Sequence, residues 1–162
     1  MIYLMSLLES YIRIEKSPSN LTIADGEAGR GIYFSLIKYP KMIDYYKKHS
    51  PHGSRIIKAT PKFKSNIVDL TEPIILNELI NFMRDEIVGL SKRMPGYKKP
   101  NINKSNYQRY GSLIQSFLRG KKIDGYIVNH EFVGSDLPTG KQLIVINEDM
   151  FEYEDVVEEE DL

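Results

Sequence analysis

The sequence contains no cysteine and only three histidines among its 162 residues. The absence of cysteine excludes disulfides, thiolate metal ligands and a cysteine nucleophile. With so few histidines, a zinc site would depend on carboxylates. We therefore expect no metal site, and we expect a protein of the reducing cytoplasm.

The chain also lacks an excess of charge of one sign and a long hydrophobic run. Lys and Arg together number 22, as do Asp and Glu, so no overall field attracts nucleic acid or an anionic membrane. The apolar stretch Met1–Leu8 is too short for a bilayer, which requires about 20 apolar residues. It also has no basic flank and no small-residue cleavage site of a secretion signal. We expect no association with membranes.

The remaining composition is that of an ordinary globular domain. Hydrophobic residues make up 41% and charged residues 27% of the chain, and this length suits one core. We expect a single domain over residues 1–153 and an acidic C-terminal tail over residues 154–162. The acidic stretch Glu152–Asp161 is expected to be solvated.

Helical periodicity is clear in two places. Thr71 is a candidate N-cap, Pro73 suits a first turn, and apolar residues then recur at helical spacing as far as Leu90. A second helix is predicted over Tyr107–Leu118, ending near Gly120. A further helix is predicted to begin at Pro40.

The segments between these helices have the branched and aromatic residues of strands. The predicted strands are Tyr11–Glu15, Gly31–Ser35, Arg55–Ala59, Asn66–Leu70, Gly125–Val128 and Gln142–Ile146. Lys16–Arg30 is predicted to be a long loop whose glycines serve either a tight turn or the close approach of a ligand. Because strands and helices do not alternate regularly, an α+β domain is favoured over a doubly wound parallel sheet.

The common nucleotide and hydrolase motifs are missing. The sequence has no Walker A loop, no GxGxxG fingerprint, no HExxH and no GxSxG elbow. It does have GRGIYFS at 29–35, a Tyr45–Tyr46 pair, KKIDGYIV at 121–128 and QLIVI at 142–146. In this order, the segments resemble those of the ADP-ribosyltransferase-like family, including its small phage, toxin and effector members.

The resemblance covers roughly Tyr11 to Tyr153 and implies a fold and an activity. The implied fold is a split sheet, mixed or antiparallel, with flanking helices. The implied activity is NAD-dependent transfer of ADP-ribose to a host macromolecule, either protein or nucleic acid, or hydrolysis of NAD. For a phage-encoded member, the site of action would be the cytoplasm of the host.

The resemblance also implies catalytic residues in the stretch Asn129-His130-Glu131. Glu131 matches the catalytic acid of the family, and Asn129 matches the amide that orients the acceptor. Cleavage of the nicotinamide–ribose bond builds positive charge on the ribose, so a fixed carboxylate stabilises the transition state more than the ground state. The Glu131 side chain suits that role.

The cofactor implied by the resemblance is NAD, and further residues match its binding positions. Arg13 is the first-strand cation, although the glycine that usually follows in the family is absent after Tyr11-Ile12-Arg13. The other implied NAD contacts are Ser35 as the second-strand hydroxyl, Tyr33 or Tyr46 against the nicotinamide, and Arg30 with the Gly26–Gly31 loop at the pyrophosphate.

Two alternatives from other classes stay open. The first is a non-catalytic phage or mobile-element protein that has this fold and acts by binding a host protein. The second is a nucleic-acid-binding protein that uses the basic segment 92–104 with its neighbouring aromatics. That segment and its flank contain Lys92, Arg93, Tyr97, Lys98, Lys99, Lys104 and Tyr107.

Overall fold

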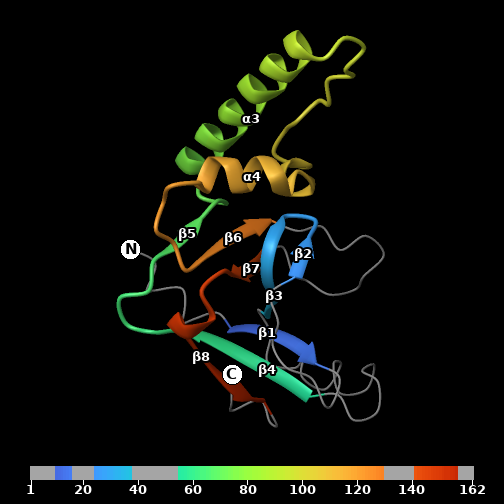
Figure 1. Ribbon diagram of the computed structural model, residues 1–162. Helices are drawn as coiled ribbons and strands as arrows, with labels where there is room; N and C mark the ends of the chain where they lie inside the picture. The colour runs from blue at the N-terminus through green and yellow to red at the C-terminus, as the bar shows by residue number, and fades with distance from the viewer. Residues whose placement is uncertain (1–9, 16–23, 38–54, 130–140, 157–162) are drawn as a thin grey trace.

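The computed structural model describes residues 10–15, 24–37, 55–129 and 141–156 (Figure 1). These residues form an α+β arrangement, as the sequence predicts. Its strands are β1 (Ser10–Glu15), β2 (Ala24–Gly26), β3 (Gly29–Ile37), β4 (Arg55–Pro61), β5 (Ile67–Asp69), β6 (Gly125–Asn129), β7 (Lys141–Val145) and β8 (Phe151–Asp155). Its helices are α3 (Pro73–Arg93) and α4 (Gly111–Leu118), with 3-10 turns η1 (Tyr107–Arg109) and η2 (Glu148–Met150). The expected helix from Pro40 lies outside the described residues.

The strands pair in the order β5-β6-β7-β3-β1-β4-β8, and β2 forms a hairpin with β3. The pair β5 and β6 is parallel, while each other described pair is antiparallel. Helices α3 and α4 cover the β6 and β7 part of this sheet, as Figure 1 shows. The described sheet is therefore mixed.

The sheet folds over on itself. The rings of Phe34 on β3 and Tyr153 on β8 stack with their centroids 6.1 Å apart. These strands are three positions apart in the sheet order, which would separate them by about 14 Å in a flat sheet. A core of apolar side chains from both halves accordingly lies between β5-β6-β7-β3 and β1-β4-β8. It contains Tyr11, Ile32, Phe34, Ile57, Ala59, Ile67, Ile127, Leu143, Val145 and Phe151.

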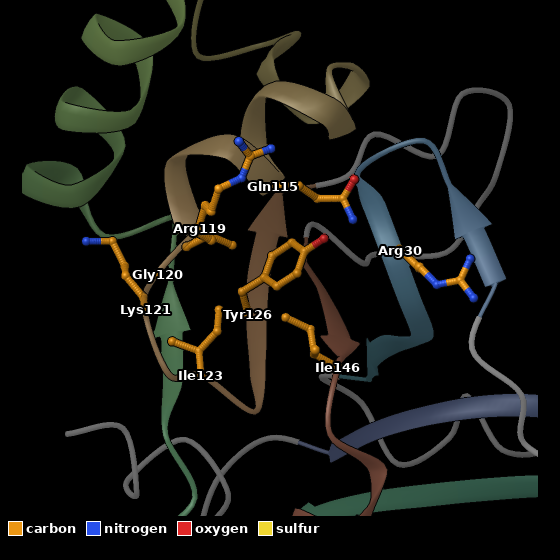
Figure 2. Close-up of a pocket in the computed structure, with 9 residues that line it drawn as sticks. Arg30, Gln115, Arg119, Gly120, Lys121, Ile123, Tyr126 and Ile146 are labelled. Atoms are coloured by element: carbon orange, nitrogen blue, oxygen red, sulfur yellow. The ribbon is translucent and has the colours of Figure 1, made fainter.

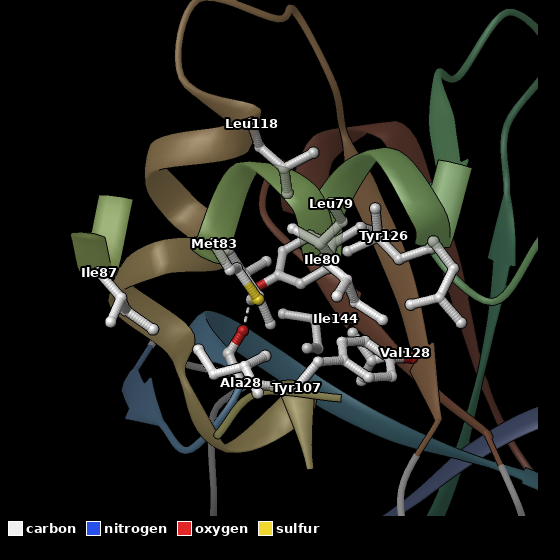
Figure 3. Close-up of a cluster of buried hydrophobic side chains, with 14 residues drawn as sticks. Ala28, Leu79, Ile80, Met83, Ile87, Tyr107, Leu118, Tyr126, Val128 and Ile144 are labelled. Carbon is white, nitrogen blue, oxygen red and sulfur yellow. Dashed lines mark hydrogen bonds between the residues drawn. The ribbon is translucent and has the colours of Figure 1, made fainter. Parts of the chain in front are cut away.

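A second core lies between the sheet and its helices (Figure 3). Helix α3 contributes residues at helical spacing, including Leu79, Met83 and Ile87. The helix begins one residue later than predicted, because Glu72 is the N-cap and accepts bonds from the backbone N–H groups of Ile74 and Ile75. The Thr71 hydroxyl donates to Asp69 instead.

The predicted helix over Tyr107–Leu118 is interrupted. Its first turn is the 3-10 helix η1, and α4 begins only at Gly111. A side chain at Gly111 would overlap the backbone of Gly29 and would lie 2.8 Å from the carbonyl oxygen of Glu27. The glycine therefore lets α4 pack directly on the β2–β3 turn.

The prediction of a long loop over Lys16–Arg30 is wrong at the C-terminal end of this range, where the chain forms the β2–β3 hairpin. Gly26 pairs with Gly29, and the Tyr33 hydroxyl accepts a hydrogen bond from the Ala28 N–H at 3.1 Å. The Tyr126 hydroxyl donates to the Ala28 carbonyl at 2.7 Å (Figure 3). These contacts fill the space beside the glycines with tyrosine side chains, so the glycines serve a tight turn.

The acidic stretch expected to be solvated from Glu152 also begins as a strand. Strand β8 pairs with β4 from Phe151 to Asp155, and Phe151 is buried. Lys58 forms an ion pair with Glu154 at 3.3 Å. Alternation explains the difference, because Phe151 and Tyr153 pack on the core while Glu152 and Glu154 are exposed.

Candidate functional site

Four strands place three of the predicted site residues at one level of the sheet. Ile12 pairs with Ser35, Ser35 pairs with Gln142, and Gln142 pairs with Val128. This set of four paired positions, the register row, spans three strand spacings, or about 14 Å. Arg13 and Asn129 each lie one residue from it. Because successive residues of a strand face opposite sides, Arg13 and Asn129 belong to the face of Ile57 and Ile127, whereas the register row belongs to the face of Val128 under the helices.

Asn129 ends strand β6 and is half-buried. Its backbone N–H donates to the hydroxyl oxygen of Tyr107 at 2.8 Å. Tyr107 is 0% exposed, and this burial raises the pKa of its hydroxyl to about 12. A neutral, buried phenol therefore fixes the end of the strand that leads toward Glu131, which lies outside the described residues.

Arg13 is held against the neighbouring strand, because its Nη1 donates to the Tyr33 carbonyl at 3.2 Å. It pairs with Ile57, which belongs to the core between the two halves of the sheet. The Tyr33 ring instead packs against the core under the helices. Directly paired residues share a face, so Arg13 and the Tyr33 ring belong to opposite faces. The structure does not bring these two predicted NAD contacts together, and Tyr46 lies outside the described residues.

Gln142 is a candidate that sequence reasoning missed. It occupies the middle of the register row and is 9% exposed. A buried amide offers both a donor and an acceptor next to Ser35 and Val128. The signal in the sequence is a polar residue at the start of the otherwise apolar run Gln142–Ile146.

A groove of about 520 Å³ lies at the other end of β3 (Figure 2). It is lined by Arg30, Gln115, Leu118, Arg119, Gly120, Lys121, Ile123, Tyr126 and Ile146, and we call it the cationic groove. Arg30 and Ser35 are five residues apart on β3, or about 17 Å. The structure therefore places Arg30, which the resemblance implies at the NAD pyrophosphate, in this groove and about 17 Å along β3 from Ser35.

Asp124 joins three strands beside the cationic groove. Its carboxylate accepts from the Asn66 backbone N–H at 2.7 Å and from the Asn147 side-chain amide at 3.1 Å. Its carbonyl accepts from the Ile146 N–H at 2.8 Å. Asp124 in the KKIDGYIV segment therefore connects the starts of β5 and β6 to the end of β7.

The basic segment 92–104 does not present the aromatics expected of a nucleic-acid surface. Lys92, Arg93, Lys98, Lys99 and Lys104 are exposed. Tyr107, however, is fully buried, and Tyr97 packs against the core under the helices. Tyr107 is therefore not accessible to a stacked base, whereas Tyr97 is half-buried.

Within residues 10–15, 24–37, 55–129 and 141–156, no three His, Asp or Glu side chains are grouped so that they could hold a metal ion. No helix among the same residues is long and apolar enough to cross a membrane. Comparisons of the chain with protein-family models, with curated proteins and with solved structures found no match.

Proposed function

We propose that the protein is an NAD-dependent ADP-ribosyltransferase or NAD hydrolase with an ADP-ribosyltransferase-like fold. The observation that carries the proposal is that Ser35, Arg13 and Asn129 lie at one level of the sheet on three strands, with Arg13 and Asn129 on the face toward the core between the two halves of the sheet and Ser35 on the other face. The folding of the sheet into two packed halves also supports it, because the family has a split sheet.

The proposed reaction breaks the bond between the nicotinamide nitrogen and C1′ of the ribose. The bonding electrons leave with nicotinamide, and positive charge develops on the ribose. The Glu131 carboxylate stabilises this charge, and an acceptor group or water then adds at C1′ and releases its proton. Arg13 supplies the first-strand cation, and Asn129 lies two residues before Glu131.

The test is to incubate the purified protein with labelled NAD, with and without a cell lysate, and to measure nicotinamide release. Replacing Glu131 with Gln removes the charge but keeps the shape, so we expect release to fall by about 100-fold or more. The matched control is Glu152→Gln, which neutralises an exposed acid on β8 and leaves the rate unchanged. Urea unfolding checks that both variants fold.

The products distinguish the two forms of the proposal. A labelled lysate component that requires Glu131 identifies a transferase and its acceptor. Nicotinamide release without a labelled component identifies a hydrolase. A wild-type protein that releases no nicotinamide, or equal release by Glu131→Gln, contradicts the proposal and favours a non-catalytic binding protein.

A further inference from the structure

We propose that the end of α3 and the turn after it bind the phosphate backbone of double-stranded nucleic acid. The first observation is an uneven distribution of charge along the chain. Residues 87–123 contain nine Lys and Arg and no Asp or Glu, although the whole chain has 22 of each class. The net charge of zero therefore conceals a strongly basic stretch, and such a stretch attracts polyanions locally.

Four of these cations lie on the two sides of one turn, and we call them the basic tip: Lys92, Arg93, Lys98 and Lys99. Helix α3 ends at Arg93, and the Tyr97 N–H then donates to the Met94 carbonyl at 3.1 Å. Between them stand Pro95 and Gly96, the latter with a φ of +80°, as in a type II turn. The ends of such a turn lie within about 7 Å of each other, so the two pairs of cations are close together.

The charges of the basic tip are available to a partner. All four side chains are exposed, and within the described part of the chain none of them forms an ion pair. Lys92 and Arg93 offset the partial negative charge at the C-terminus of α3. That effect is confined to the last turn of a helix, so it does not account for Lys98 and Lys99.

The basic tip projects from the packed part of the protein on a fixed support. Ile87 is the last buried residue of α3, and Figure 1 shows the end of the helix extending past α4. The chain that returns from the tip is held against the helix, because the Arg84 guanidinium donates through Nε and Nη2 to the Ile102 carbonyl at 3.2 and 3.0 Å. Ile102 is itself buried. The tip can therefore approach a large polyanion while its position on the protein stays defined.

The chemistry of the basic tip favours a nucleic-acid duplex over other anionic partners. Three of its four cations are lysines, which are depleted in protein–protein interfaces. Among residues 92–99, Met94 is the only large apolar side chain that is exposed, at 51%, which gives little area for insertion into a bilayer. The one aromatic residue of this range, Tyr97, is half-buried against the core under the helices, so no fully exposed ring is offered to single-stranded bases. Contact with the phosphates of a duplex requires only the exposed cations.

This inference does not rest on the proposed enzymatic activity. The basic tip belongs to α3 and the turn after it, whereas Arg13, Ser35 and Asn129 lie on β1, β3 and β6. Nucleic-acid binding and nicotinamide release are therefore separate measurements, and either can fail without the other.

The test is a titration of a fluorescein-labelled DNA duplex of about 20 base pairs with the protein, followed by fluorescence anisotropy at several salt concentrations. An RNA duplex of the same sequence is titrated in parallel, and the tighter of the two identifies the class of duplex. We expect the logarithm of the association constant to fall against the logarithm of salt concentration with a slope of about −3 to −4, as four phosphate contacts require.

The basic tip is tested by Lys98→Gln/Lys99→Gln. We expect this double variant to bind the duplex at least about tenfold more weakly at about 0.1 M salt, with the slope reduced by about 2. The matched control is Lys62→Gln/Lys64→Gln, which removes the same charge from two exposed lysines in the turn after β4 and leaves the affinity unchanged. Both double variants change exposed side chains, so their urea midpoints should equal that of the wild type.

Four results would overturn this assignment. Equal weakening by both double variants would show that binding follows net charge and not the basic tip. Tighter binding to one strand of the same sequence would indicate stacking on bases. Binding to vesicles that contain phosphatidylserine but to neither duplex would make the tip a membrane contact. Absence of binding to both duplexes and to vesicles at low salt would remove it.

Discussion

Strand β6 is held by different chemistry at its two ends. At the Gly125 end, Asp124 accepts hydrogen bonds from Asn66, Ile146 and Asn147 and so joins three strands. At the Asn129 end, the backbone N–H donates to the buried Tyr107 hydroxyl. The first end carries most of the KKIDG pattern that underlies the family resemblance. This part of the pattern therefore has a structural explanation. The proposed activity depends instead on the Asn129 end of β6.

The largest expected loss of stability is at the groove end of β3. A Cβ on Gly31 would overlap the Ile144 side chain and lie 2.8 Å from the Val145 carbonyl oxygen. We expect Gly31→Ala to lower the free energy of unfolding by about 3 kcal/mol, measured by urea unfolding. The control is Gly89→Ala on α3, where a Cβ meets nothing within 4 Å. It is expected to stabilise the protein by about 1 kcal/mol; the same loss in both variants would contradict the packing argument.

A smaller loss is expected from Asp124→Ala. The change leaves the Asn66 N–H and the Asn147 amide without their carboxylate partner. The free energy of unfolding should fall by about 2 kcal/mol, and Asp124→Asn, which keeps one oxygen, should lose about half of that. Asp85→Ala removes an exposed carboxylate from α3 and is expected to change stability by less than about 0.5 kcal/mol. Equal effects at positions 85 and 124 would show that Asp124 does not anchor the strands.

The smallest loss is expected at the Asn129 end. Tyr107→Phe removes the acceptor of the Asn129 N–H and should lower the free energy of unfolding by about 1 kcal/mol at neutral pH.

Because burial raises the pKa of Tyr107 to about 12 from 10.0, the folded state keeps a proton that the unfolded state loses. Stability present below pH 10 should therefore fall between pH 10 and 12, by about 1.4 kcal/mol per pH unit for this group.

The pH dependence gives a direct check on that assignment. Burial also raises the pKa of Tyr153 to about 12, so the wild-type slope contains more than one tyrosine. Urea unfolding of Tyr107→Phe across this range should show a shallower decline than the wild type. An unchanged slope would mean that Tyr107 does not titrate as a buried group.

Much of the fold follows from local patterns in the sequence. The apolar spacing after Pro73 predicts α3, and the branched runs predict β3, β4, β6 and β7. The β2–β3 hairpin was missed because β2 contains only three residues, Ala24–Gly26, in a polar stretch. Strand β8 was missed because its acidic residues obscure the alternation of Phe151 and Tyr153.

The candidate site was less predictable, because it depends on which strands pair and in what register. No local pattern states that Ser35 lies between Ile12 and Gln142. The same long-range pairing places Arg30 in the lining of the cationic groove. It also places the Tyr33 hydroxyl where it accepts a hydrogen bond from the Ala28 N–H of the hairpin. Sequence reasoning could name the residue types suggested for NAD binding and the strands that carry them. It could not say which of these residues lie close together.

The most direct test of the central proposal is the rate of nicotinamide release from NAD by wild type, Glu131→Gln and Glu152→Gln under identical conditions. The proposed site predicts release by the wild type and by Glu152→Gln, with a fall of about 100-fold or more only in Glu131→Gln. Equal rates in the three folded proteins, or no release by the wild type, would contradict it.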